Sequence, residues 1–241
     1  MMTQSQPNKI VGIPIYDDST LLDFCGATQV FAFARGFSPI LIGKSLAPVM
    51  TTEGVSVVPS HTFVSHPRID VLFVPGGGGA GVSHAMQDPE LQSFIKRAAT
   101  TASWSGSVCT GAFVIAAAGL LDGCQATTYW SVLEVLNRFP NVTVDLDCYP
   151  RSKICPEQGR FSGGGVSSAI DLALELVELL GSKEIAEAAD LAIQYAPDPP
   201  VKSGDPSQAS PELVEKMRAL QQTRFIQPIS DATDLIVGRQ D

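Results

Sequence analysis

The stretch Trp104-Ser-Gly-Ser-Val108, followed at once by Cys109-Thr-Gly-Ala-Phe-Val-Ile-Ala-Ala-Ala-Gly-Leu-Leu121, decides the fold class of this 241-residue chain. Its first five residues predict a buried strand, and the residues after Cys109 predict a helix over 110–121 that is almost free of charge. A helix without a charged face belongs in the protein interior. The sequence therefore passes directly from a buried strand into a buried helix.

The same alternation continues on both sides of this stretch. Because strands alternate with helices, we expect βαβ units and a mostly parallel sheet with helices on both faces. We expect a disordered tail over residues 1–9, one α/β domain over 10–200, and a C-terminal helical extension and tail over 201–241. Further strands are expected at 10–16, 39–43, 71–74 and 142–146, a hairpin at 49–58, and a loop or edge hairpin at 151–161. Further helices are expected at 20–35, 88–99 and 131–139, before Gly181, after Ser182, and at 211–225.

Composition excludes several classes of protein. Sixteen basic and 25 acidic residues give a formal charge of -9, without the basic face that nucleic-acid binding requires. The longest strongly apolar stretch, 112–121, is half of the ~20 residues that a membrane span needs. The N-terminus lacks the pattern of a signal peptide, so we expect a cytoplasmic protein. Five cysteines without a CxxC pair, and three histidines without ligand spacing, predict no disulfide framework, metal or cofactor.

Cys109 is the first candidate for chemistry, because it lies at the predicted strand-to-helix turn of Ser107-Val-Cys-Thr-Gly111. A turn of this kind lifts the central side chain above the sheet as a nucleophile elbow. Backbone N–H groups and the dipole of the following helix are expected to depress the pKa of its thiol. The alternative is an ordinary small residue at a tight turn, the role we expect for the other four cysteines as small buried hydrophobic residues.

A glycine run supplies the second candidate. Phe73-Val-Pro-Gly-Gly-Gly-Gly79 follows a buried strand, and glycines at a strand's carboxyl end bring N–H groups close to a ligand. An anion hole is the favoured interpretation. A phosphate cradle and a flexible turn are the alternatives.

Asp23 is the third candidate, at the start of the first predicted helix in Leu21-Leu-Asp-Phe24. Its apolar neighbours suggest desolvation, which disfavours the charged form and suits a general acid. The alternative needs no chemistry, since Thr20 and Asp23 also fit a capping box.

Taken together, the motifs resemble the ThiJ/PfpI superfamily, flavodoxin-like relatives of the class I glutamine amidotransferases, and within it the isonitrile (isocyanide) hydratase branch. The likeness covers residues 10–211 or so. It implies a doubly wound sheet and a homodimer. Besides the glycine run and the Cys109 motif, it rests on Ala116-Ala-Ala-Gly-Leu-Leu-Asp-Gly123, Ala126-Thr-Thr128, Gly163-Gly-Gly-Val166, Ile170-Asp171 and Ile193-Gln-Tyr-Ala-Pro-Asp-Pro-Pro200.

This resemblance implies a lyase that hydrates isonitriles to N-substituted formamides. Cys109 would be the nucleophile that forms a thioimidate, and Asp23 the general acid and base. Thr110 would orient Asp23 or the water, while N–H groups near Gly77, Gly78 and Thr110 hold developing charge on the small-molecule substrate.

Three features depart from that branch, namely Tyr129 in place of a histidine, Cys25 in the helix-one motif, and a longer segment over Cys148–Gly159. Two alternatives therefore stay open. One is a cysteine hydrolase or deglycase of another small electrophile, although such relatives usually carry histidine directly after the cysteine, where this chain has Thr110. The other is a non-enzymatic redox or ligand sensor that uses Cys109.

Overall fold

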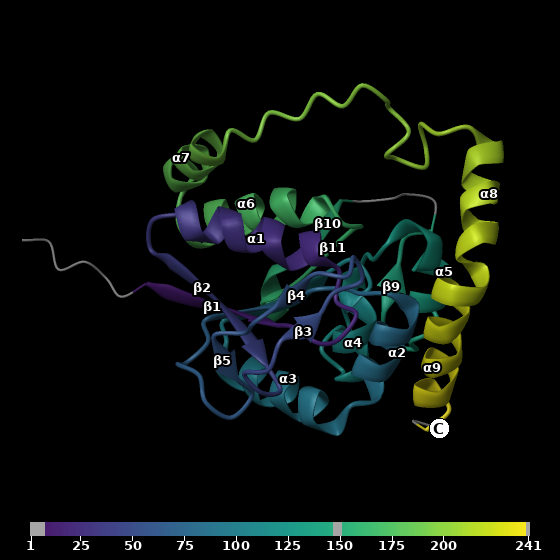
Figure 1. Cartoon of the computed structure of the whole chain (residues 1–241), viewed down its shortest axis with the longest axis horizontal. Coiled ribbons are helices and arrows are strands. Elements are labelled where there is room, and N and C mark those ends of the chain that lie inside the picture. The colour runs from purple at the N-terminus through teal and green to yellow at the C-terminus, as the bar shows by residue number, and fades with distance from the viewer. Residues whose placement is uncertain (1–7, 147–150, 240–241) are drawn as a thin grey trace, which may run out of the picture.

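The computed structural model describes residues 8–146 and 151–239, and at its centre is a seven-stranded sheet in the order β10-β11-β7-β6-β1-β2-β5 (Figure 1). Neighbouring strands are parallel except β10, which runs antiparallel to β11 at one edge. The strands of this sheet are β1 (Lys9–Pro14), β2 (Phe37–Gly43), β5 (His61–Thr62), β6 (Val71–Val74), β7 (Trp104–Val108), β10 (Ser152–Cys155) and β11 (Arg160–Gly163). The inner order β2-β1-β6-β7-β11 is that of a flavodoxin-like doubly wound sheet, which confirms the expected fold class.

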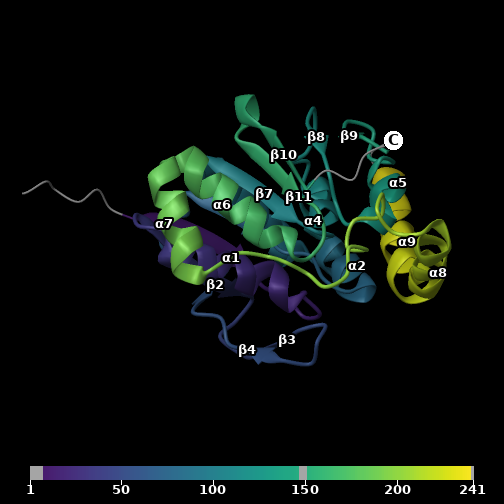
Figure 2. The same cartoon turned by 90° about the horizontal axis from the view of Figure 1, so that it is seen from above.

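Helices cover both faces of the sheet, as the pattern predicts. One core cluster joins α1, α6 and α7 to one face, and a second joins α2, α3, α4, α5 and α9 to the other. Figure 2 shows α8 and α9 beside α2 and α5, at the end of the molecule away from α7. The helices are α1 (Leu21–Phe33), α2 (Gly79–Gln87), α3 (Pro89–Thr101), α4 (Gly111–Ala117), α5 (Leu133–Leu136), α6 (Ser168–Leu180), α7 (Lys183–Ile193), α8 (Pro211–Gln221) and α9 (Gln227–Val237).

The strand order determines where a site can form. The chain leaves β1 toward β2 on one side and later adds β6 on the other side of β1. Ligands bind at such a switch point, outside the carboxyl ends of the strands. The start of α1, the glycine run after β6 and the turn after β7 all meet there.

Several element boundaries differ from the expectation. The glycine run does not form a flexible turn but leads into α2, whose first residue, Gly79, packs against the backbone of Phe225. The helix expected at 211–225 continues through a π-helical turn (Gln222–Ile226) into α9. The helix expected at 131–139 is reduced to a 3₁₀ turn (Trp130–Val132) and α5. These differences depend on contacts between distant segments, which local patterns do not contain.

The short strands lie outside the main sheet. β3 (Val49–Met50) and β4 (Ser56–Val57) form the expected hairpin, whereas β9 (Thr143–Val144) pairs with β8 (Gln125–Ala126) instead of joining the main sheet. The segment expected as a loop or edge hairpin is the antiparallel β10–β11 pair. Over the residues described here, no helix is both long and apolar enough to cross a membrane.

Candidate active site

Cys109 occupies the turn between β7 and α4, as the elbow interpretation predicts. Its φ is +55°, in the left-handed region that non-glycine residues rarely adopt, and such strain collects at functional sites. The Cys109 N–H donates to the carbonyl oxygens of Gly163 (3.0 Å), the last residue of β11, and of Gly164 (2.9 Å), the residue after it. A Cβ on Gly111 would run into the carbonyl oxygens of Val74 and Pro75, so glycine is required for the turn to pack.

Asp23 reaches the same point from the first turn of α1. Its side chain is fully buried, and Oδ2 accepts a hydrogen bond from the Gly76 N–H (2.8 Å). Within the described part of the chain, Oδ1 is buried without a hydrogen-bond partner. The capping-box alternative is wrong, because Thr20 caps α1 without a side-chain hydrogen bond and Asp23 turns toward the glycine run instead.

Burial controls the charge of this carboxyl group. Desolvation, with a smaller contribution from the charge of Glu53, raises the pKa of Asp23 to about 8, against the lowering effects of the Gly76 N–H and the Cys109 side chain. Asp23 is therefore largely protonated at neutral pH, as the sequence interpretation expects of a general acid.

The expected depression of the Cys109 pKa is wrong in sign. The thiol is 3% exposed, and burial together with the nearby Asp23 charge raises its pKa well above the usual value. The N–H groups of Thr110 and Val166 and the Thr110 hydroxyl lower it, but they do not offset the loss of hydration. The resting site thus holds a thiol and a carboxylic acid.

Thr110 is hydrogen-bonded directly to the glycine run, which the sequence does not predict. The Thr110 hydroxyl donates to the Gly77 carbonyl oxygen and accepts from the Gly77 N–H, both at 3.0 Å. The Gly78 N–H donates to the carbonyl oxygen of Asp18 (2.9 Å). The N–H groups of Gly77 and Gly78 therefore already have acceptors within the protein, and their first role is to hold the loop.

Gly76 separates the acid from the elbow. A Cβ on this residue would lie 2.6 Å from Thr110 Oγ1, 2.7 Å from Thr110 N and 2.9 Å from Asp23 Oδ2. Such approaches are shorter than van der Waals contact, so only glycine lets Thr110 and Asp23 face the same peptide. The structure thus brings Asp23, Thr110, Gly77 and Cys109 together, with Gly78 at the margin.

Sequence reasoning missed two neighbours of Cys109. Tyr16, just beyond β1, donates its hydroxyl to the Pro75 carbonyl oxygen (2.9 Å), and burial, Asp23 and Cys109, in that order, raise its pKa. Val166 brings its N–H toward the Cys109 sulfur from the loop before α6. The signals available were a tyrosine after a buried strand and the Gly163–Gly165 run before a helix.

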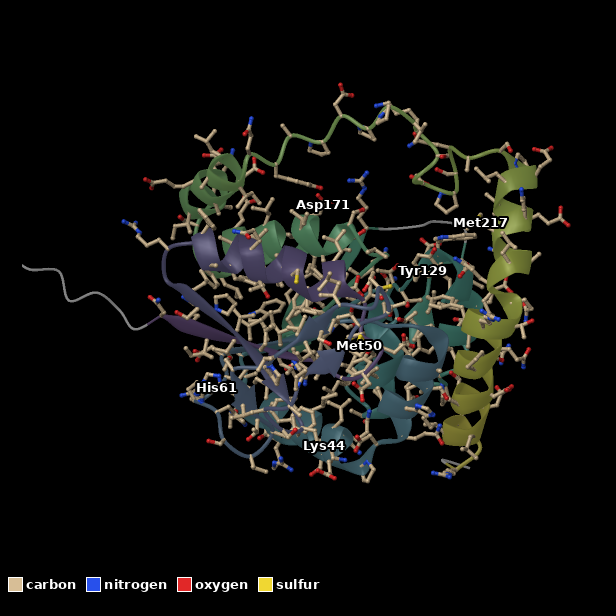
Figure 3. All side chains as sticks on the ribbon, viewed as in Figure 1. Lys44, Met50, His61, Tyr129, Asp171 and Met217 are labelled. Atoms are coloured by element: carbon tan, nitrogen blue, oxygen red, sulfur yellow. The ribbon has the colours of Figure 1, made fainter. Side chains whose placement is uncertain are left out.

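Tyr129 links this site to the C-terminal helices. Its ring lies where a Cβ on Gly165 would be, its hydroxyl accepts from Gln221 Nε2 (3.0 Å), and it stands edge-on to Phe225 with ring centroids 5.4 Å apart. Figure 3 shows His61 at the left edge of the molecule, well away from Tyr129. His61 belongs to β5, the edge strand, which β2, β1 and β6 separate from β7 and the elbow, so its imidazole does not reach Cys109.

The other cysteines differ in how far they are buried. Cys124 and Cys155 are buried as expected, Cys25 is exposed on α1 and contradicts that expectation, and Cys148 lies outside the described residues. In the ranges 8–146 and 151–239, no group of three or more His, Cys, Asp or Glu side chains has a metal-binding arrangement.

The chain is similar in sequence and in structure to several known proteins. The profile of the DJ-1/PfpI family matches residues 9–179. The chain is 35% identical over 208 residues to an isonitrile hydratase of Pseudomonas putida, covering 86% of this chain and 88% of that protein. A ThiJ/PfpI family protein from Pseudomonas syringae has a crystal structure that matches with a TM-score of 0.87 at 30% identity, over 96% of this chain and 93% of that one. A similarity of 24% over 196 residues relates 77% of the chain to 50% of the HTH-type transcriptional regulator GbdR of Pseudomonas aeruginosa.

Proposed function

The chain belongs to the DJ-1/PfpI family, and from that premise we propose that it is a lyase that hydrates isonitriles, R–N≡C, to N-substituted formamides, R–NH–CHO. The observation that carries the proposal is a fully buried Asp23 carboxyl beside the Cys109 thiol at a strained elbow. The identity of 35% to an isonitrile hydratase over most of both chains supports the same reaction.

The first step forms a carbon–sulfur bond. Asp23 gives its proton to the terminal carbon of the isonitrile, and the Cys109 sulfur bonds to that carbon while the thiol proton passes to the Asp23 carboxylate. The product is the thioimidate R–N=CH–S–Cys109. The raised pKa of Asp23 suits this role, because a general acid must be protonated at working pH. A neutral pair also suits an uncharged substrate entering a buried site.

The second step consumes water. Asp23 protonates the thioimidate nitrogen, and a water molecule adds to the carbon as its proton passes to the Asp23 carboxylate, which gives R–NH–CH(OH)–S–Cys109. The carbon–sulfur bond then breaks, and the hydroxyl proton passes to sulfur. Formamide and the Cys109 thiol are released, and Asp23 is again protonated.

We assign supporting roles to the neighbours of this pair. The N–H groups of Thr110 and Val166 point at the sulfur and stabilise negative charge that develops on it. Thr110 positions the loop of Gly77 through its paired hydrogen bonds, and Gly76 N–H orients Asp23. Gly77 and Gly78 would contact substrate as part of this held loop.

The alternatives from the sequence make different predictions. A cysteine hydrolase or deglycase would release products from amides or methylglyoxal, and a redox sensor would be oxidised at Cys109 by peroxide without turnover. A ligand sensor, the remaining alternative, would bind a small molecule without converting it.

The test is the electrospray mass of the intact protein during steady-state exposure to a simple alkyl isonitrile. We expect a transient increase equal to the mass of the substrate, mapped to Cys109, while formamide accumulates. Absence of both adduct and product would overturn the proposal and direct the assays to the other electrophiles.

We also propose a homodimer. Light scattering of the purified chain tests it, and a monomeric mass would refute it.

A further inference from the structure

A second pair of reactive groups lies outside the proposed site. Cys124 precedes β8, and Cys155 is the last residue of β10; their sulfur atoms are 3.0 Å apart although 31 positions separate them in the chain. Both side chains are buried, and both are free thiols. Sulfur atoms at this distance need to move by only about 1 Å to reach the 2.05 Å of a disulfide.

The surroundings are those of a pair of thiols and not of a metal site. Cys155 Sγ lies 3.1 Å from Glu157 Oε1, and Cys124 Sγ lies 3.4 Å from Gln158 Oε1. In the described part of the chain, this group does not form a metal-binding cluster. Pro156–Gln158, the turn next to the pair, is exposed at every residue, so a small oxidant has a short route to the sulfurs.

Each cysteine is connected to a segment that supports Cys109. After Cys124 the chain passes through β8 to Thr128, whose hydroxyl donates to the Cys109 carbonyl oxygen (2.8 Å). Cys155 ends β10, which pairs with β11, and the carboxyl end of β11 supplies the carbonyl oxygens of Gly163 and Gly164 that accept the Cys109 N–H. A bond between the two sulfurs would therefore tie the segment that carries Thr128 to the β10–β11 pair, and so connect both supports of the elbow.

We propose that Cys124 and Cys155 form a reversible disulfide when the protein meets a peroxide, and that this bond fixes the frame that holds Cys109. One thiol loses its proton, and the thiolate attacks a peroxide oxygen; the O–O bond breaks, a sulfenic acid forms, and the hydroxide that leaves takes up that proton as water. The second sulfur attacks the first and displaces hydroxide, which takes up the remaining thiol proton as a second water. Two thiols are oxidised by two electrons, and hydrogen peroxide is reduced to two waters. The inference is independent of the isonitrile reaction.

The rate of this reaction has a predicted pH dependence. Burial, the neighbouring Cys124 thiol and Glu157 raise the pKa of Cys155 to about 12. Attack requires a thiolate, so the bond should form faster as pH rises. Burial of Cys155, with smaller contributions from Cys124 and Glu157, therefore slows oxidation at neutral pH.

The experiment uses the full-length Cys109→Ser variant, reduced, freed of reductant and treated with hydrogen peroxide. This background removes oxidation of the proposed nucleophile, and it removes Cys109 from the tryptic peptide 98–138 that carries Cys124. We expect the intact mass to fall by about 2 Da and peptide 98–138 to be joined to peptide 154–160. The Tm should rise by roughly 5–10 °C, because the bond closes a loop of ~30 residues, and dithiothreitol should reverse both changes.

The matched control adds Cys155→Ser, which should show neither the cross-link nor the rise in Tm. A cross-link from Cys155 to a different cysteine, or oxygen addition without a cross-link, would overturn the proposal. If the Cys155→Ser protein does not fold, the peptide map of the Cys109→Ser protein decides by itself.

Discussion

Cys109 and the Cys124–Cys155 pair are both hidden from solvent, and burial raises the pKa of Cys109 and of Cys155, yet their neighbours differ. Cys109 has a strained backbone, two N–H groups aimed at its sulfur, and a protonated carboxyl group as its partner. Cys155 has another sulfur at 3.0 Å and a carboxylate from an exposed turn. Burial alone therefore does not identify a nucleophile; the groups that can donate and receive a proton do.

The Cys109→Ala substitution should have the largest effect on activity and should separate the two thiol environments most clearly. Formamide production from an alkyl isonitrile should fall by about 10⁴-fold or more in kcat/KM, because loss of a nucleophile removes the covalent pathway. Cys124→Ala is the matched control and should keep activity within about threefold. Equal losses in both variants would mean that the two thiol environments are not functionally distinct.

Asp23→Asn tests the acid beside Cys109. The amide keeps the shape of the side chain but cannot cycle a proton, so kcat/KM should fall by roughly 10²–10⁴-fold. At pH 8 the Tm should not decrease, because the variant removes a carboxylate that is costly to bury. A large loss of Tm together with activity would show that Asp23 is structural. Asp171→Asn, which alters an acid on α6 bonded to Arg151 and Tyr195, is the control.

The pH profile follows from the same carboxyl group. Since the pKa of Asp23 is raised from 3.8 to about 8, kcat/KM should fall about tenfold per pH unit above that value. The folded protein binds more protons than the unfolded chain between pH 4 and 8. The contribution of Asp23 to the free energy of unfolding is therefore present below pH 4 and lost as pH rises through 8. Urea titrations should show this slope, and Asp23→Asn should flatten it.

The sequence predicts those features of the Cys109 site that lie within short contiguous segments. The strand, turn and helix of the Cys109 motif are contiguous, so their pattern alone predicts the elbow. The apolar neighbours of Asp23 predict a desolvated acid, but Thr20 and Asp23 also fit a capping box. Only the hydrogen bond from the Gly76 N–H distinguishes the acid from the helix cap.

The rest depends on contacts between distant segments. The pairing of Cys124 with Cys155 depends on how the ends of β8 and β10 meet, and Val166 reaches Cys109 only through the order of β7 and β11. The sign of the Cys109 pKa shift was wrong because burial by the surrounding elements outweighs the N–H groups that the motif itself provides. Desolvation is a property of the packed molecule and leaves little trace in a short motif.

The smallest effects are expected from Cys124→Ser, a substitution in the Cys124–Cys155 pair and not at Cys109. In the reduced protein, Cys124→Ser should lower the free energy of unfolding by only about 1–2 kcal/mol, because the hydroxyl can still donate to Cys155 Sγ or Gln158 Oε1. Since the frame around Cys109 keeps its own hydrogen bonds, kcat/KM should change by less than about threefold. Urea denaturation and steady-state kinetics under reductant measure both quantities. A loss of activity much greater than the loss of stability would mean that this thiol takes part in the reaction at Cys109, and that the two environments form one site.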